Sequence, residues 1–265
     1  MRGWKKWGAY GMLLGICFFC GGQLAERQAV RADAPKEGKQ AELALLIDDF
    51  GYHGEGTEEM LALPVPLTAA VMPFSEHSIR DAEAVRRGGK EIFIHMPMES
   101  LTGKPEWVGE KGVFRRMTDA EVRRAAEEAF AVLPDAAGMN NHMGSAIMED
   151  RRTLSVIMEV LKEKGVMFAD SMTTPKSLGR ELAEKAGVPF FARSVFLDST
   201  DDPEIVKQKL RQAADLALRD GKALAIGHVG PEGGRITAEA IRLLLPELKE
   251  KGIVFVKVSE LVKGD

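Results

Sequence analysis

The clearest fold signal lies in residues 43–52, which read LALLIDDFGY. An apolar run typical of a buried strand ends there on two adjacent carboxylates, Asp48 and Asp49. Burying such a pair without partners would cost several kcal/mol for each charge. We therefore expect this strand to deliver both carboxylates to an active site at its carboxyl end, where a cation often accompanies them.

The same strand pattern recurs along the chain and alternates with amphipathic stretches. Predicted strands cover residues 43–47, 67–72, 91–94, 137–140, 166–169, 189–192, 223–226 and 253–256, and predicted helices cover 75–87, 118–133, 151–164, 175–186, 203–219 and 237–251. Repeated strand–helix alternation is typical of an α/β fold with a parallel sheet. The count favours a single-domain (β/α) barrel of seven to eight mostly parallel strands, with its function at their carboxyl ends. Residues 99–116 are expected to form a long loop or lid.

Polar residues follow most of these strands. They are Asp48 and Asp49, then His95, then Asn140, Asn141 and His142, then Asp170, then Arg193 and Asp198, and finally His228. A closed parallel sheet brings such strand ends into one bowl. Two imidazoles and a carboxylate are a usual site for zinc or another divalent ion, which lowers the pKa of bound water and polarises a carbonyl. A second carboxylate could take a proton, and a further histidine could protonate a leaving group.

The first 40 residues differ from the rest of the chain. A basic start precedes the apolar run 11–20, which is the pattern of a secretory signal. We expect residues 1–34 to be a signal peptide or an N-terminal membrane anchor with a polar linker, and residues 41–265 to be a catalytic domain that is secreted or held in the cell envelope. Both cysteines precede residue 21, so a metal in the domain must use His, Asp or Glu. The net charge of −4 argues against nucleic acid as a partner.

Four stretches resemble the divergent branch of the polysaccharide deacetylases. They are LLIDDFGY at 45–52, HMPME at 95–99, NNHMGS at 140–145 and AIGHVG at 225–230. The resemblance covers nearly everything after residue 40. It implies a distorted (β/α) barrel, seven-stranded in the better-known members, that hydrolyses N-acetyl and sometimes O-acetyl groups of glycans with a bound divalent metal.

The resemblance also implies roles by position. The first aspartate of the pair, Asp48, would be the general base, and the second, Asp49, a metal ligand. His95 would be another ligand. The late histidine, His228, would match the general acid or a group that stabilises the transition state.

Two residues are candidates for the third metal ligand. The family places a second ligand histidine four residues after the first, and this chain has Glu99 there. His142, which directly follows a strand, and Glu99 are both candidates. Asn141 could orient His142 or bind substrate. Asp170 and Arg193 could form a structural ion pair, or they could position the base.

Hypotheses of different classes follow. The first is a metal-dependent hydrolase, most simply with one zinc ion, that removes acetyl groups from N-acetylated envelope or other polysaccharides. The second, motivated by Glu99, is an exported, non-catalytic protein that binds saccharides on a deacetylase-like scaffold. A hydrolase of a different amide or ester is a third. The glycan and the oligomeric state are left open by the sequence.

Overall fold

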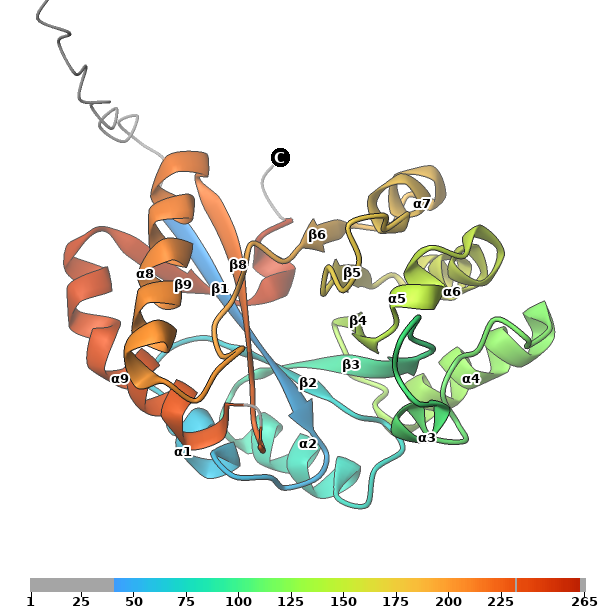
Figure 1. Ribbon diagram of the computed structural model, residues 1–265, viewed down its shortest axis with the longest axis horizontal. Coiled ribbons are helices and arrows are strands. Elements are labelled where there is room, and N and C mark those ends of the chain that lie inside the picture. Colours follow the sequence, from blue (N-terminus) through green and yellow to red (C-terminus); the bar gives the residue numbers. More distant parts are fainter. Residues whose placement is uncertain (1–40, 232, 263–265) are drawn as a thin grey trace, which may run out of the picture. The chain divides into compact units, whose positions relative to one another are not determined.

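The computed structural model describes residues 41–231 and 233–262, which form one curved sheet with helices around it (Figure 1). The strands are β1 (Ala41–Phe50), β2 (Thr68–Val71), β3 (Glu91–Met98), β4 (Gly138–Met143), β5 (Met167–Asp170), β6 (Phe190–Ala192), β7 (Val195–Phe196), β8 (Lys222–His228) and β9 (Ile253–Val256). The helices are α1 (Thr57–Leu61), α2 (Ser78–Arg87), α3 (Pro105–Val108), α4 (Asp119–Val132), α5 (Ser145–Met148), α6 (Arg151–Lys164), α7 (Gly179–Ala186), α8 (Pro203–Asp220), α9 (Gly234–Glu250) and the 3-10 turn Val258–Glu260.

The sheet is parallel, and one short segment of chain connects its two end strands. Its order is β6-β5-β4-β3-β2-β1-β8-β7, and β9 pairs with the first residues of β1. β6 pairs with β5 and β7 pairs with β8, although only Arg193 and Ser194 separate them. The chain therefore passes from one end of the sheet to the other within two residues. This curls the sheet into a distorted barrel, and the predicted fold class is confirmed.

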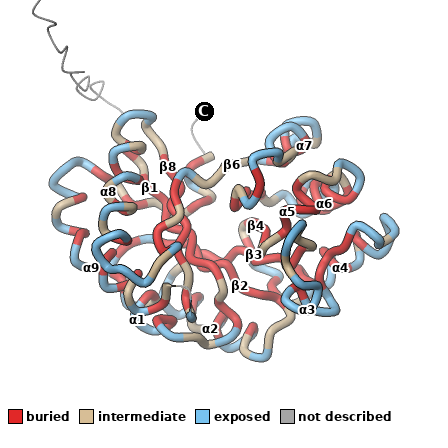
Figure 2. The backbone as a smooth tube through the Cα atoms, in the orientation of Figure 1, coloured by how far each residue is buried: buried red, intermediate tan, exposed pale blue. Residues whose placement is uncertain are grey.

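The helices cover the outer face of the sheet, where the larger apolar core lies. Figure 2 shows the strands buried and the outward sides of the helices exposed. Local sequence signals mark several helix ends. Thr118 and Glu121 form a capping box at the start of α4, and Asp202 caps α8. Gly165 ends α6 with a φ of 70°, a left-handed conformation in which glycine avoids the strain of a Cβ atom.

The inward face of the barrel changes from apolar to polar along the strands. Successive residues of a strand point to opposite faces, so every second one faces inward. The inward cluster includes Ala44, Leu46, Phe93, Leu224 and Ile226. The next position of the same parity is Asp48 on β1, His95 on β3 and His228 on β8. An apolar plug therefore fills the barrel, and ionisable groups lie on top of it.

Several elements differ from the sequence prediction. The short elements α1, α3, α5 and β7 were not predicted, and α7 begins at Gly179 instead of residue 175. Strands β1, β3 and β4 run further than expected, so Asp48, His95 and His142 lie within strands and not after them. Apolar runs mark only the part of a strand that touches the core, whereas backbone pairing continues under the polar residues.

The proposed leader, residues 1–34, lies outside the described residues. Within 41–231 and 233–262, none of the helices has both the length and the apolar character needed to span a bilayer.

Candidate metal centre

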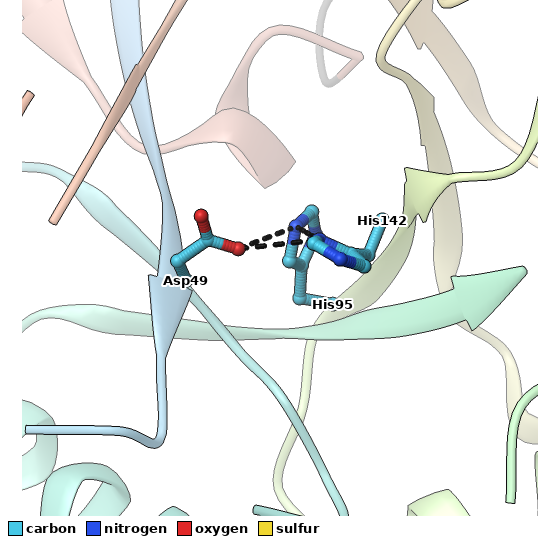
Figure 3. Close-up of side chains that lie close together, drawn as sticks. All are labelled: Asp49, His95 and His142. Atoms are coloured by element: carbon cyan, nitrogen blue, oxygen red, sulfur yellow. Dashed lines mark hydrogen bonds and ion pairs between the residues drawn. The ribbon is translucent and has the colours of Figure 1, made fainter. Parts of the chain in front are cut away.

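Three donor atoms from three strands meet above the apolar plug (Figure 3). Oδ1 of Asp49 lies 3.3 Å from Nε2 of His95 and 3.2 Å from Nδ1 of His142. The two ring nitrogens are 3.1 Å apart. The three atoms form a nearly equilateral triangle. Among the described residues, Asp49, His95 and His142 are the group of donors whose ligand atoms are close enough to share one ion.

The triangle fits a divalent cation. Two ligands bound to a tetrahedral ion at zinc distances are about 3.3 Å apart, close to each edge of this triangle. Oδ1 of Asp49 is buried and has no hydrogen-bond partner, because the two nitrogens lie at ion-pair distance without hydrogen-bond geometry. A buried carboxylate oxygen that faces two imidazole nitrogens is a donor set that suits zinc.

One side of the centre is open to solvent. The side chain of His95 is only 2% exposed, whereas those of Asp49 and His142 are 18% and 23% exposed. Catalytic zinc sites have three protein ligands and an open position, and structural sites are closed. The open side therefore leaves room for water or a substrate beside a bound ion.

Charge is balanced within the cluster. Burial would raise the pKa of Asp49, but the adjacent imidazoles of His142 and His95 outweigh it and hold that pKa well below its usual range. Burial would lower the pKa of His95, but the carboxylates of Asp48 and Asp49 raise it. An ion that binds there must displace any proton carried by the ring nitrogens that face it.

A local distortion of β1 brings two neighbouring carboxylates into one site. On a regular strand Asp48 and Asp49 would point to opposite faces. Asp49 instead has a φ of 68°, and the pairing of β1 with β2 shifts register between Ile47 and Phe50. A left-handed aspartate costs roughly 1–2 kcal/mol. Such strain is typical of functional sites, and here it turns the Asp49 carboxylate toward the histidines.

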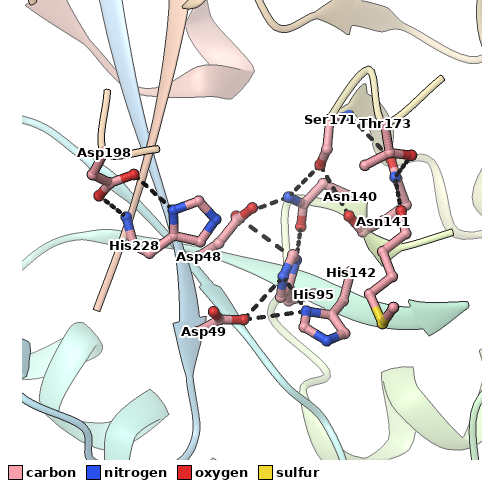
Figure 4. Close-up of polar contacts among 11 residues, drawn as sticks. Asp48, Asp49, His95, Asn140, Asn141, His142, Ser171, Thr173, Asp198 and His228 are labelled. Atoms are coloured by element: carbon pink, nitrogen blue, oxygen red, sulfur yellow. Dashed lines mark hydrogen bonds and ion pairs between the residues drawn. The ribbon is translucent and has the colours of Figure 1, made fainter. Parts of the chain in front are cut away.

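Asn140 links a proposed ligand to the proposed base (Figure 4). Nδ1–H of His95 donates to Oδ1 of Asn140 at 2.8 Å, which leaves Nε2 of His95 as the nitrogen that faces Asp49. Nδ2 of Asn140 donates to Oδ1 of Asp48 at 2.8 Å and to the hydroxyl of Ser171 at 3.2 Å. Partners of this type fix the tautomer and the ring orientation of a ligand histidine.

We expect Asn140→Ala to weaken zinc binding about 10–100-fold, because His95 loses the acceptor that fixes its tautomer. Asn140→Asp retains that acceptor but loses the amide that donates to Asp48, so its zinc affinity is expected to lie between those of Asn140→Ala and wild type. Titration against a chromophoric chelator measures both constants. Wild-type affinity in Asn140→Ala would show that the hydrogen bond does not support the ligand.

A second pair lies on the other side of Asp48. His228 is in register with Asp48 on neighbouring strands. Its Nδ1–H donates to Oδ1 of Asp198 at 2.8 Å, and its backbone N–H and the hydroxyl of Thr237 donate to Oδ2 of Asp198. The other ring nitrogen of His228 faces the side on which Asp48 lies (Figure 4). Burial would lower the pKa of His228, but the carboxylates of Asp198 and Asp48 raise it to about 9.

Comparison with known proteins places this arrangement in a family. The sequence profile of the divergent polysaccharide deacetylases matches residues 45–262. The chain belongs to the divergent polysaccharide deacetylase family. The uncharacterised protein YibQ of Escherichia coli is 34% identical over 221 residues, which are 83% of this chain and 67% of that protein.

Solved structures share the fold of this chain. The uncharacterised protein ATU2773 of Agrobacterium tumefaciens superposes with a TM-score of 0.77 at 22% identity, covering 86% of this chain and 91% of that one. The Bc1960 peptidoglycan N-acetylglucosamine deacetylase superposes with a TM-score of 0.53 at 15% identity, covering 88% and 92%. At these identities the likeness is one of fold.

The geometry favours His142 over Glu99 as the third candidate ligand of the metal centre. Glu99 is not a member of the donor triangle. Its carboxylate accepts the backbone N–H of Arg115 at 2.7 Å and the guanidinium of Arg115 at 3.0 Å. Glu99 thus anchors the segment that leads into α4.

Asn141, expected to orient His142 or bind substrate, instead bonds to the carbonyl of Met143, to Thr173 and to the backbone of Ser171.

Asp170 and Arg193 lie near each other, but among the described residues no ion pair joins their side chains. Asp170 accepts hydrogen bonds from the backbone of Met172 and the hydroxyl of Ser177. The guanidinium of Arg193 donates to the carbonyls of Ser171 and Met172 and lies 3.9 Å from the ring of Phe196, which stacks on His228. The expected salt bridge is therefore replaced by backbone contacts, and Arg193 supports the wall behind His228.

Two residues of the site had no assigned role in the sequence prediction. Asn140 was named only as a polar residue after a strand, although its spacing from His142 places it on the same inward face of β4. Asp198 was noted after a strand but not connected to His228. No local signal identifies that contact, since Asp198 lies 30 residues before its partner.

Proposed function

We propose that this chain is a divalent-metal-dependent hydrolase that removes acetyl groups from an N-acetylated polysaccharide. The observation that carries the proposal is the solvent-accessible triangle of Asp49, His95 and His142, flanked by Asp48 on one side and by the His228–Asp198 pair beyond it. Membership of the deacetylase family supports the reaction class. The fold shared with a peptidoglycan N-acetylglucosamine deacetylase supports an envelope glycan as the substrate class.

Asp49, His95 and His142 would hold the ion, and zinc suits this donor set best. A zinc ion there would polarise the acetyl carbonyl and lower the pKa of a coordinated water. The remaining chemistry belongs to the side chains. Burial raises the pKa of Asp48 above its ordinary value, against the opposing charges of His95 and His228. A carboxylate shifted in this direction is better matched to accepting a proton from the attacking water near neutral pH.

His228 supplies the second proton transfer. With a pKa raised to about 9, its imidazole is protonated at neutral pH and can donate to the departing amine nitrogen. Asp198 holds the ring by Nδ1, so that Nε2 is the nitrogen directed to the substrate. Asn140 keeps Asp48 in place through its amide.

The pH profile tests this division of roles. A general acid must be protonated, so we expect kcat/KM to fall as the pH rises through the pKa of His228, near 9 in the metal-free chain. Asp198→Asn removes the carboxylate that raises this pKa, and we expect the basic limb to move toward the ordinary value of about 6.5. A basic limb that is the same in both proteins would exclude His228 as the acid.

Metal analysis combined with acetate release tests the function itself. The purified chain is expected to bind one zinc per molecule and to release acetate from N-acetylglucosamine oligomers. Binding of these oligomers without acetate release would instead support the non-catalytic saccharide-binding function. Release from O-acetylated xylan alone would make the chain an esterase.

We also propose that residues 1–34 export or anchor the domain, which fractionation of cells would test.

A further inference from the structure

A cleft lies near the metal centre, since Pro97 in its wall is in register with His142 on the neighbouring strand. Its volume is about 380 Å³, and its walls come from the ends of β1, β2 and β3 and from α3. The side chains that matter are Tyr52, Phe74, Pro97, Trp107 and Lys111. Ligand sites are usually clefts of about 300–1,000 Å³ with apolar, often aromatic walls and a few polar groups. The cleft has this size and this composition.

Two of the aromatic walls are unusually accessible. Trp107 is 61% exposed and Tyr52 is 55% exposed. The ammonium of Lys104 lies 5.9 Å from the centre of the Trp107 ring. Large aromatic side chains that remain in solvent beside a cleft are common at binding sites, because a flat apolar ring with a polar edge matches an amphipathic ligand.

The segment that carries Trp107 is held firmly against β3. The backbone N–H of Val113 donates to the carbonyl of Pro97, and the N–H of Glu99 donates to the carbonyl of Val113. Val108, next to Trp107, is buried. Gly112 packs so closely that a Cβ atom there would lie 2.2 Å from Val108. The indole is therefore presented on an anchored platform, which lowers the entropic cost of binding.

The cleft and the metal centre are built on the same strand ends. Pro97, in the wall of the cleft, follows His95 by two residues and is in register with His142. Tyr52 follows Asp49 by three residues. A polymer whose acetyl group lies at the metal centre can therefore extend toward this cleft.

We infer that the cleft is a subsite that binds a sugar ring of the acetylated glycan, with the ring stacked on Trp107 and Tyr52. The inference rests on the proposed function. The carbon-bearing face of a pyranose is apolar and suits aromatic rings, while its hydroxyls suit charged groups. Glu106, Glu110 and Lys111 line the same cleft and supply such groups. The subsite extends substrate selection from the acetyl group to the neighbouring sugar.

Fluorescence reports this binding directly. In the full chain with Trp4→Phe and Trp7→Phe, Trp107 is the only tryptophan. A tetramer of N-acetylglucosamine is expected to change its emission in a saturable way. Calorimetry of the zinc-loaded Asp48→Asn protein, in which turnover is blocked, is expected to show about tenfold weaker tetramer binding after Trp107→Ala. Leu243→Ala, which removes a 49% exposed apolar side chain from α9, is expected to leave binding unchanged.

The outcomes separate this inference from the proposed function. Saturable tetramer binding that depends on Trp107, in a chain that releases no acetate, would support the subsite and reject the hydrolase. Acetate release from the tetramer with the same KM in Trp107→Ala and wild type would reject the subsite and support the hydrolase. The subsite would also be overturned if the wild-type chain does not bind the tetramer, or if Trp107→Ala alters only the oligomeric state.

Discussion

Asp49→Asn is expected to lower the affinity for zinc by more than the roughly 100-fold that loss of a supporting partner costs. The substitution removes the anionic ligand from the triangle with His95 and His142. Asparagine is the best probe here because it tolerates the left-handed conformation that residue 49 adopts, with a φ of 68°. Loss of zinc would then report the missing charge, and not a rearranged backbone. Elemental analysis and competition with a chelator measure the effect.

His95→Ala is expected to behave in the same way, because it removes the most buried of the three donors. His77→Ala is the matched control: His77 lies immediately before α2 and is not a member of the donor triangle. It should retain one zinc per chain. Stoichiometric zinc in both Asp49→Asn and His95→Ala would mean that the ion binds elsewhere, and thermal unfolding of each variant would verify that it is folded.

Asp48→Asn is expected to reduce kcat for acetate release by about 10²–10⁴-fold, which is the usual contribution of a general base. Zinc should remain, because Asp48 is not part of the donor triangle. The asparagine can still accept the hydrogen bond from Nδ2 of Asn140. Acetate release within a few-fold of wild type would exclude Asp48 as the base. The control is Asp135→Asn, which makes the same chemical change at an exposed residue outside the donor triangle.

The same substitution has an effect on stability that activity alone would not show. A carboxyl whose pKa is raised by folding destabilises the native state as the pH rises through that pKa, because the folded form holds its proton more tightly than the unfolded form. Asp48→Asn removes this penalty. The metal-free variant is therefore expected to unfold at a higher temperature than wild type at pH 7, with a smaller difference at pH 4. Such an exchange of stability for activity is common at functional sites.

Much of the fold could be predicted because its signals are local. A buried parallel strand needs a short apolar run, and a helix needs an apolar stripe and a cap; both patterns lie within a few residues of one another. The position of Asp48, His95 and His228 at the polar ends of such runs was sufficient to place them in one bowl, since parallel strands in a barrel end on the same side.

The partners within the site could not be predicted in the same way. The hydrogen bonds that connect His95 to Asn140 and Asn140 to Asp48 join residues 45 and 92 positions apart. The engagement of Glu99 by Arg115, which argues against Glu99 as a ligand, depends on how the segment before α4 folds back onto β3. The exposed indole of Trp107 on its platform likewise depends on contacts between α3 and that strand.

The sequence by itself determined the alternation of strands and helices, the barrel that follows from it, and which ionisable residues reach its open end. Only the tertiary structure decided that Asp49 twists into the site, that His142 completes the triangle, and that Asn140 and Asp198 hold the groups beside them. The physical reason is range. Periodicity and capping act between neighbours along the chain. A ligand triangle and its hydrogen bonds require atoms from distant strands to meet within about 3 Å, and only the curled sheet brings those strands so close.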